Sequence, residues 1–439
     1  VDGGALFQLW APHAATVELA AGEGDDTAFL AMDKDAEGWW RLKTDAVPVG
    51  GAYGFRVDGG KPVPDPASRE QTFDVHSRSR LVDPHAYEWR SSAWRGRPWH
   101  ETVFYEMHVG TFTDEGTFDS AIERLDHLKA TGITAIELLP VAEFGGRRGW
   151  GYDGVLLYCP HGVYGGHRGL KRLVDAAHER GLMVFLDVVY NHFGPDGNYI
   201  PSYLPDFFQS EIHTPWGPAI AYDEPAVRDF MIENALYWLE EYRIDGLRLD
   251  AIDSIHDTTD TPLVEELAKR VRAAFPDRHV HLTSEDERNI TRYIERGADG
   301  SIPIVSGEWN DDFHHAAHVL ATNDREGYYI DYEFDTVEQI ATALATGFVY
   351  QGEHSPHRDR DVGETSDHLP PTAFVNFLQN HDQIGNRAFG DRLRSLSSAR
   401  AFLSALESVT GWREDADGRL VLLGADGTSL MVLVRGTNA

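Results

Sequence analysis

The chain has 439 residues, enough for about two to four domains around a large core. It carries 71 acidic and 39 basic residues, which gives a formal net charge of −32 at pH 7. Such a chain repels polyanions, so nucleic acid and anionic membrane surfaces are not expected partners.

The single cysteine, Cys159, rules out a disulfide within the chain and favours a reducing compartment. No signal peptide is recognisable at the N-terminus. No uninterrupted apolar run approaches the length of a membrane-spanning helix. We therefore expect a cytoplasmic protein, and we expect it to be a monomer.

Residues 1–90 are predicted to form a separate β-sandwich. Apolar side chains alternate with small or polar ones in short runs, and turn residues such as Asp58-Gly59-Gly60 separate these runs. Trp10, Trp39 and Trp40 suit sugar binding, but core packing is the simpler explanation. The Pro-rich stretch 61–66 and the polar segment that follows it link this module to the rest of the chain.

From Glu101 onward, predicted strands alternate with predicted helices. The strands are expected at 103–109, 135–139, 182–189, 244–250, 279–285, 302–309 and 373–378. Helical stripes of apolar residues are expected at 118–128, 170–177, 225–238 and 262–275. Seven strands with mostly helical connections favour a (β/α)8-type (TIM) barrel over an open sheet, and residues 91–395 are predicted to form this catalytic barrel.

The strand expected near 244–250 carries a cation and a carboxylate on one face. Successive strand side chains alternate, so Arg248 and Asp250 point to the same side. The arginine should keep the carboxylate ionised at neutral pH, which suits a nucleophile. An ion pair that only stabilises the end of the strand is the alternative.

Polar residues also follow other predicted strands, where the active sites of barrels are found. The third strand is followed by Asn191-His192, the fifth by Glu285-Asp286 and the seventh by Asn380-His381-Asp382. A single polar strand end is explained by a helix cap. Four of them in one barrel favour an active site.

These strand ends resemble the four signature regions of the α-amylase superfamily of glycoside hydrolases. The first region matches residues 187–192, the second matches 246–250, the third contains Glu285 and the fourth matches 377–382. The resemblance covers the predicted third, fourth, fifth and seventh strands in the family's order.

The resemblance implies a role for each matching residue. Asp250 would be the nucleophile, Glu285 the general acid/base and Asp382 the stabiliser of the transition state. The sugar bound before the scissile bond would contact Arg248, His192 and His381. This chemistry needs no cofactor, and no metal site is expected.

Longer stretches are similar to the maltooligosyltrehalose trehalohydrolases within this superfamily. These stretches are 10–12, 64–69, 146–153, 191–195, 213–217, 311–315, 347–352 and, most tellingly, 380–393. The similarity implies a retaining hydrolase that cleaves the α-1,4-glucosidic bond next to the terminal trehalose of a maltooligosyltrehalose and releases trehalose. Two alternatives are a glycogen-branching-type α-glucan transferase and an inactive carbohydrate-binding scaffold.

Several loop residues are candidates for sugar contacts. Tyr152 is placed to stack under a sugar ring, with ordinary loop packing as the alternative. Trp216 and the segment 286–288, which contains Asp286, lie in loops on the proposed leaving-group side; a solvated loop is the alternative there. Asp253 stands where the family commonly has a histidine, which bears on recognition of the leaving group.

Two further segments stand out in the second half of the chain. The histidines at 314, 315 and 318 share one predicted helix, but without an H-E-x-x-H pattern they are better explained by packing than by metal binding. Residues 322–371 are expected to form a long irregular connection that borders the cleft.

The C-terminal part departs from the family pattern. The 57 residues after Asp382 contain one predicted helix at 394–408 and a hairpin, 419–423 and 429–434, that turns at Asp426-Gly427. No eighth barrel strand is visible there, nor the Gly-Glu-Glu-containing segment expected after it. Residues 396–439 are therefore predicted to form a small element of their own that is apparently shortened.

Overall fold

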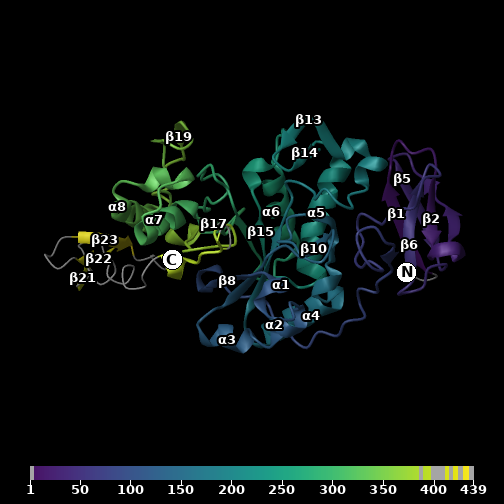
Figure 1. The fold of residues 1–439 in the computed structure, drawn as a ribbon, viewed down its shortest axis with the longest axis horizontal. Helices are drawn as coiled ribbons and strands as arrows, with labels where there is room; N and C mark the ends of the chain where they lie inside the picture. The colour runs from purple at the N-terminus through teal and green to yellow at the C-terminus, as the bar shows by residue number, and fades with distance from the viewer. Residues whose placement is uncertain (1–3, 385–388, 397–410, 415–418, 424–428, 435–439) are drawn as a thin grey trace. The chain divides into compact units, whose positions relative to one another are not determined.

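The protein is described here by a computed structural model that covers residues 4–384, 389–396, 411–414, 419–423 and 429–434. The chain divides into two compact units, Val1–His281 and Leu282–Ala439 (Figure 1). Helices and strands carry the labels of Figure 1.

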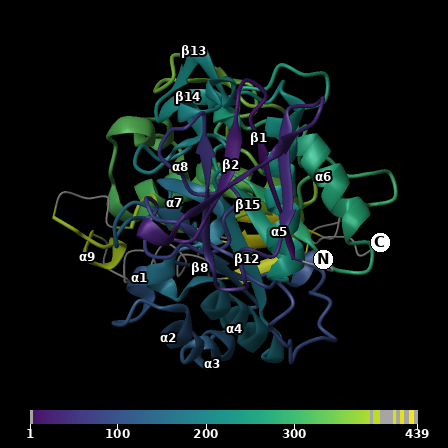
Figure 2. The same ribbon diagram turned by 90° about the vertical axis from the view of Figure 1, so that its right-hand side faces the viewer.

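The first unit begins with the predicted β-sandwich, which is the purple segment in Figure 2. One sheet has the strand order β1-β5-β4 and the other β3-β2-β6-β7. The strands are β1 (Ala5–Trp10), β2 (Val17–Ala21), β3 (Ala28–Ala31), β4 (Asp33–Lys34), β5 (Trp39–Thr44), β6 (Ala52–Val57) and β7 (Ser79–Arg80).

The core of the sandwich follows the predicted alternation. Phe7 and Leu9 on β1 are buried among residues of the facing sheet such as Leu19 and Phe55. Trp40 is buried in this core as expected. Trp10 and Trp39 are directly opposite each other across β1 and β5, but they are only half-buried and lie outside the core cluster.

Four neighbouring parallel strands form the centre of the first unit. Their order is β15-β12-β9-β8, with β8 (Phe104–Met107), β9 (Ala135–Leu138), β12 (Met183–Val188) and β15 (Gly246–Leu249). The last three strands are buried along their whole length, as their apolar sequences predict. Gly246 is required by close packing, because a Cβ atom there would lie 2.2 Å from the ring of Phe185 on the neighbouring strand.

Helices connect these parallel strands. They are α1 (Val109–Phe112), α2 (Phe118–Ile122), α3 (Leu125–Ala130), α4 (Gly166–Glu179), α5 (Pro225–Glu241) and α6 (Leu263–Ala274). The prediction of a single helix at 118–128 is wrong, because Glu123 and Arg124 separate this stretch into α2 and α3. Helix α4 ends at Glu179, shortly before Gly181, whose φ of 77° favours a residue without a Cβ atom. Helix α5 begins at Pro225.

Two antiparallel hairpins interrupt the alternation of strands and helices in the first unit. The first pairs β10 (Ala142–Phe144) with β11 (Gly154–Pro160), and the second pairs β13 (Phe208–Thr214) with β14 (Gly217–Ile220). Neither hairpin was predicted. The second one holds Trp216 at its turn.

The second unit contains three more parallel strands and two longer helices. The strands are β16 (His281–Ser284), which begins at the last residue of the first unit, β17 (Gly307–Trp309) and β20 (Phe374–Val375). Their order is β16-β17-β20, and the helices are α7 (Asp311–Thr322) and α8 (Thr336–Thr346). The seven predicted strands are therefore all present, although β17 and β20 are shorter than expected.

The connection between the sixth and seventh predicted strands is more regular than the sequence suggested. Residues 322–371 contain helix α8 and a small hairpin of β18 (Glu353–Ser355) and β19 (Arg360–Val362). Tyr329, Tyr332, Ile340 and Tyr350 pack with α7 into a separate core cluster. The prediction of an irregular loop is wrong, because its tyrosines supply enough buried surface to order the segment.

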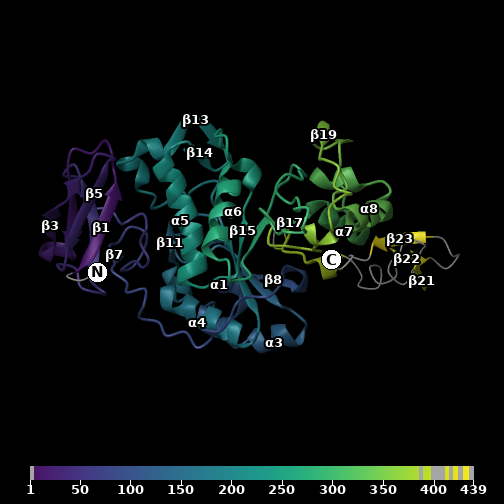
Figure 3. The same ribbon diagram turned by 180° about the vertical axis from the view of Figure 1, so that it is seen from behind.

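The C-terminal segment contains α9 (Leu393–Leu396) and an antiparallel sheet (Figure 3). The sheet has β21 (Gly411–Glu414), β22 (Arg419–Leu423) and β23 (Ser429–Val434), so both predicted hairpin strands are confirmed. The helix predicted at 394–408 and the turn at Asp426-Gly427 lie largely or wholly outside the described residues. Within the described ranges, no eighth parallel strand is found and no helix has the length and hydropathy needed to cross a bilayer.

Asp245, just before β15, ties several elements of the first unit together. Its carboxylate accepts hydrogen bonds from the indole Nε1 of Trp94 at 2.7 Å and the backbone N–H of Val184 at 2.9 Å. It also pairs with Nε2 of His178 at 2.8 Å, and both side chains are fully buried. The ring of His178 stacks on Trp94. One carboxylate therefore fixes a linker, a helix and a strand.

We predict that Asp245→Ala lowers the free energy of unfolding by about 3 kcal/mol, because it leaves several buried polar groups without their acceptor. Denaturant unfolding followed by tryptophan fluorescence measures this change. Asp126→Ala is the matched control, since it removes a carboxylate that is 76% exposed and pairs with Arg180 at 2.8 Å. The control should unfold almost like the parent. Equal losses in both variants would contradict the role given to Asp245.

Candidate active site

A buried guanidinium organises the polar residues at the end of β15. Nη1 of Arg248 donates to Oδ2 of Asp187 at 2.7 Å and to Oδ1 of Asp250 at 2.8 Å. Asp187 and Arg248 are opposite each other in the register of β12 and β15, and the Arg248 side chain is fully buried. The parallel register and the alternation of strand side chains thus bring one cation between two carboxylates.

The second oxygen of Asp250 is held from the neighbouring loop. Nδ2 of Asn191 donates to Oδ2 of Asp250 at 2.9 Å and also to its backbone oxygen at 2.9 Å. The Asp250 side chain keeps 11% of its surface exposed. Both carboxylate oxygens are oriented by a buried donor while one side of the group stays accessible, which is the arrangement that an attacking carboxylate requires.

The chain turns sharply directly after Asp250. Ala251 adopts a left-handed conformation with a φ of 40°, which is costly for a residue with a Cβ atom. Such strain persists where the surrounding structure imposes it, and it is concentrated at functional sites. It directs the chain away from β15 immediately after the carboxylate.

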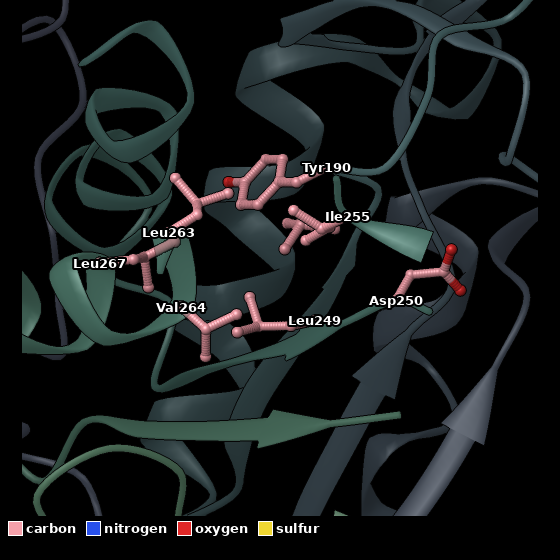
Figure 4. A pocket seen from close by; sticks show the side chains of 8 residues that line it. Tyr190, Leu249, Asp250, Ile255, Leu263, Val264 and Leu267 are labelled. Carbon is pink, nitrogen blue, oxygen red and sulfur yellow. The ribbon is translucent and has the colours of Figure 1, made fainter. Parts of the chain in front are cut away.

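Apolar packing anchors Asp250 from behind. Figure 4 shows the side chains of Leu249, Ile255 and Val264 grouped with Tyr190, while the carboxylate of Asp250 points away from this group. The strand end is therefore held by a rigid apolar layer, and the carboxylate projects from it.

Tyr152 makes a hydrogen bond that was not predicted, while its stacking under a sugar ring stays a prediction. Its hydroxyl donates to Oδ2 of Asp187 at 2.7 Å, on the same oxygen that Arg248 contacts. Burial, followed by the charge of Asp187, raises the pKa of Tyr152 well above its usual value, so the hydroxyl stays protonated and remains a donor. Sequence reasoning missed this contact because 35 residues separate the partners.

His192 and Trp216 extend the site toward the β13–β14 hairpin. Nε2 of His192 donates to the backbone oxygen of Tyr152 at 2.9 Å, and its Nδ1 contacts Oδ1 of Asn191. Burial lowers the pKa of His192, although the charge of Asp250 opposes this shift. The indole of Trp216 stacks on the imidazole with ring centroids 4.9 Å apart, and Trp216 remains 49% exposed. Five of the predicted site residues therefore form one connected group: Tyr152, His192, Trp216, Arg248 and Asp250.

Glu285 and Asp286 belong to the second unit and follow the end of β16. Glu285 is half-buried and Asp286 is buried. The carboxylate of Asp286 accepts from Nε and Nη2 of Arg288 at 2.7 and 2.6 Å, so the two side chains form a bidentate pair. A direct contact of Asp286 with sugar hydroxyls stays a prediction, and Arg288 occupies both of its oxygens here.

Asp382 and His381 lie in a turn after β20, also in the second unit. The backbone N–H of Asp382 donates to Oδ1 of the buried Asn380 at 2.9 Å. Nε2 of His381 lies 3.5 Å from Oδ1 of Asp382, whose side chain is 45% exposed. The predicted convergence of Asp250, Glu285 and Asp382 in one cleft stays a prediction.

Two polar residues of this site were not assigned roles from the sequence. Asp187 is a carboxylate within an otherwise apolar buried strand, a signal that could have marked it as a partner for a buried cation. Asn191 offered no comparable signal, because asparagine after a strand is common in turns.

The histidines of α7 pack against aromatic rings. Nδ1 of His314 donates to the backbone oxygen of Leu378 at 2.6 Å, and burial lowers the pKa of His314 to about 4. His318 stacks on Tyr329 with centroids 4.3 Å apart. Across the described part of the chain, no group of three or more His, Cys, Asp or Glu residues is arranged to hold a metal ion.

Known proteins match this chain over most of its length. The family model for the α-amylase catalytic domain matches residues 95–209 and 203–412. The model for carbohydrate-binding module 48, the isoamylase N-terminal domain, matches residues 1–86. A crystal structure of a protein from Salmonella typhimurium assigned as an α-amylase superposes with a TM-score of 0.88 at 48% identity, covering 93% of this chain and 70% of that one. These matches confirm the predicted barrel and the predicted N-terminal sandwich.

Relatives from several organisms are named malto-oligosyltrehalose trehalohydrolases. The one from Arthrobacter ramosus is 44% identical over 396 residues, which are 88% of this chain and 68% of the relative. The one from Rhizobium sp. strain M-11 is 42% identical over 423 residues, 94% of this chain and 70% of the relative. The chain thus spans somewhat more than two thirds of each of these two relatives. From the site geometry and these matches together, we conclude that the chain belongs to the α-amylase family of glycoside hydrolases, within the group of the malto-oligosyltrehalose trehalohydrolases.

Proposed function

We propose that this protein hydrolyses the α-1,4-glucosidic bond next to the terminal trehalose of a maltooligosyltrehalose, with retention of the anomeric configuration. The observation that carries the proposal is the carboxylate of Asp250, oriented on both oxygens by Arg248 and Asn191 and still accessible. The name shared by the relatives supports trehalose as the leaving group.

In the first step of the proposed mechanism, an oxygen of Asp250 attacks the anomeric carbon of the glucose before the scissile bond. The bond from that carbon to the glycosidic oxygen breaks as a covalent glycosyl-enzyme forms. Glu285 gives its proton to the leaving oxygen, so trehalose departs as a neutral alcohol. Asp382 stays ionised and stabilises the positive charge that develops on the ring.

In the second step, Glu285 takes a proton from water and the resulting oxygen attacks the same anomeric carbon. The bond to Asp250 breaks, the maltooligosaccharide leaves with the α-configuration, and both carboxyl groups return to their starting states. The proposal requires the carboxyl groups of Asp250 and Glu285 to stand about 5–5.5 Å apart, as in retaining glycosidases.

Arg248 has a positioning role in this mechanism. It fixes the direction of the Asp250 carboxylate and balances its charge within a buried environment. Tyr152 and His192 extend the same network toward the surface, and the exposed indole of Trp216 offers a flat apolar face. We propose that these groups contact the substrate, together with His381.

Recognition of trehalose is proposed to involve the loop after β16. Asp286 and Arg288 form a bidentate pair after this strand, and guanidinium and carboxylate groups are the partners that suit sugar hydroxyls. Asp253 occupies the position where the family commonly has histidine and offers a carboxylate acceptor instead. Buried hydroxyl partners discriminate strongly, because a wrong sugar leaves polar groups unpaired.

We also propose a domain organisation with three parts. Residues 1–90 form a carbohydrate-binding module, 91–395 the catalytic barrel and 396–439 a small C-terminal element. The two family models, which match 1–86 and 95–412, support the first boundary. A cytoplasmic location is supported by the buried free thiol of Cys159. The monomeric state stays a prediction.

Asp250→Ala should lower kcat on maltotriosyltrehalose by about a thousandfold or more, because no glycosyl-enzyme can form. The fold should survive, since Arg248 keeps its bond to Asp187. Product chromatography measures the rate and circular dichroism checks the fold. Asp223→Ala, at an exposed carboxylate, is the control and should behave like the parent. Substantial turnover by Asp250→Ala would remove the nucleophile assignment.

Glu285→Gln should also lose turnover of maltotriosyltrehalose, because its amide has no proton to give to a poor leaving group. The same variant should still release the aglycone of an activated aryl α-glucoside at a slow but measurable rate, since that leaving group needs no protonation. The absorbance of the released aglycone in stopped assays measures this rate. Equal losses on both substrates would contradict the acid role and favour a structural one.

The substrate assignment predicts that maltotriosyltrehalose gives maltotriose and free trehalose, while maltopentaose is cut far more slowly. The reducing-end glucose of maltopentaose cannot occupy a site built for a 1,1-linked disaccharide. Chromatography compares the rates, and early NMR spectra should show the α-anomer of the product. Equal rates on the two substrates would indicate a general α-glucan hydrolase. Products longer than the substrate would indicate a transferase, and no products would indicate a binding scaffold. A β-anomer would overturn the retaining mechanism.

A further inference from the structure

A short turn follows β16 in the second unit and begins with Glu285, the proposed acid/base. Its bidentate pair, Asp286 with Arg288, is tightened by the backbone N–H of Arg288, which donates to Oδ1 of Asp286 at 3.0 Å. The turn ends at Asn289, whose φ of 54° is a left-handed conformation that asparagine tolerates. Residues 285–289, the acid turn, therefore form a compact unit whose position depends on what holds its two ends.

One end of the acid turn continues from β16, and a buried carboxylate on α7 holds the other end. Nδ2 of Asn289 donates to Oδ2 of Asp312 at 2.8 Å, and both residues are buried. The same Oδ2 accepts from the backbone N–H groups of Val349 at 2.6 Å and Tyr350 at 3.0 Å. Oδ1 of Asp312 accepts from the hydroxyl of Tyr332. One carboxylate thus joins the acid turn to three residues that follow α7 in the chain.

The insertion between α7 and β20, residues 322–371, contacts the acid turn at two further points. Nη1 of Arg358 donates to the backbone oxygen of Glu287 at 2.5 Å. The backbone N–H of Glu364 donates to the backbone oxygen of Asn289 at 3.0 Å. The acid turn therefore takes its position from the insertion, and the carboxylate on α7 is the group at which helix, turn and insertion meet.

The chemistry of Asp312 favours positioning over simple packing. Burial raises the pKa of Asp312, and the hydrogen bonds from its four neutral donors oppose that shift. Burial, followed by the charge of Asp312, raises the pKa of Tyr332 well above its usual value, so the hydroxyl stays a donor. A well-packed apolar side chain often stabilises a buried place as well as a charged one does. It cannot hold donors from separate segments in fixed directions.

We propose that Asp312 is a positioning residue for the acid turn and thereby determines how well the enzyme recognises its leaving group. This role rests on the proposed function, in which Glu285 protonates the leaving oxygen and the loop after β16 contacts trehalose. Asp312 acts through Asn289 and not by contact with the substrate. Because the proposed acid and the proposed trehalose contacts share one short turn, a small displacement of that turn misplaces both, and such misplacements cost up to about a hundredfold in rate.

The variant Asp312→Asn tests the role, because it keeps the shape of the side chain but replaces one accepting oxygen with a donor. Its kcat/KM for maltotriosyltrehalose should fall about tenfold or more, and the inhibition constant of trehalose should rise by a similar factor. Its kcat/KM for an activated aryl α-maltotrioside should change less than about twofold, since that leaving group needs neither protonation nor the trehalose site. Initial rates with and without added trehalose give these constants.

Asp335→Asn is the matched control, because it makes the same change at an exposed carboxylate of the insertion. It should behave like the parent on both substrates. Equal losses of Asp312→Asn on maltotriosyltrehalose and on the aryl substrate would show a purely structural role and overturn the proposal. Unchanged constants on both substrates would overturn it as well.

A second variant reaches the same connection from the other side. Asn289→Gly removes the amide that Asp312 holds, and glycine accepts the φ of 54°. It should show the same selective loss, and the double variant should lie within about twofold of the weaker single variant, because both changes break one connection. Losses that multiply in the double variant would overturn the proposal. If Asp312→Asn does not fold, Asn289→Gly alone must reproduce the selective loss.

Hydrogen–deuterium exchange separates the positioning role from the proposed function. In ligand-free Asn289→Gly, exchange should be faster than in the parent for peptides from 285–291 and unchanged for peptides from 336–346 on α8. A parent enzyme that does not cleave maltotriosyltrehalose would refute the proposed function, and faster exchange in the turn would still support its positioning by Asp312. Unchanged exchange in the turn would overturn the positioning role even in an enzyme that releases trehalose.

Discussion

The guanidinium of Arg248 is the group on which the candidate site depends most. It is fully buried and contacts carboxylates on its own strand end and on the neighbouring strand. Burying a cation costs several kcal/mol, and that cost is recovered only when the geometry of its partners is good. Asp187 and Asp250 supply such partners at 2.7 and 2.8 Å. The position of the Asp250 carboxylate is therefore set by an interaction that the fold cannot easily give up.

The register of β12 and β15 makes this interaction possible. Gly246 lets the two strands approach closely at their starts, because a side chain there would collide with Phe185. Two residues further along, the same register places Arg248 opposite Asp187. A shift of one residue would turn Arg248 and Asp250 to the other face of the sheet. Close packing at one end of the strand thus determines the chemistry at its other end.

The indole of Trp216 gives the candidate site an accessible aromatic face. It stacks on His192 beside the charged network around Arg248. A flat apolar face next to fixed hydrogen-bonding groups is typical of small-molecule sites.

Much of this protein was determined by its sequence alone. Period-two alternation located the sandwich, near-continuous apolar runs located the buried parallel strands, and polar residues at strand ends located Asp250 and Glu285. These features are local, because burial on one face or on both faces of a strand is visible in the order of the residues. The tertiary structure decided the rest. Asp250 is bonded to Asn191 and Tyr152 to Asp187, although the two residues of each pair are far apart in the chain. The tertiary structure also left Trp10 and Trp39 half-buried and outside the sandwich core. No local pattern encodes such pairings, since they arise only when packed elements bring distant side chains within hydrogen-bonding distance.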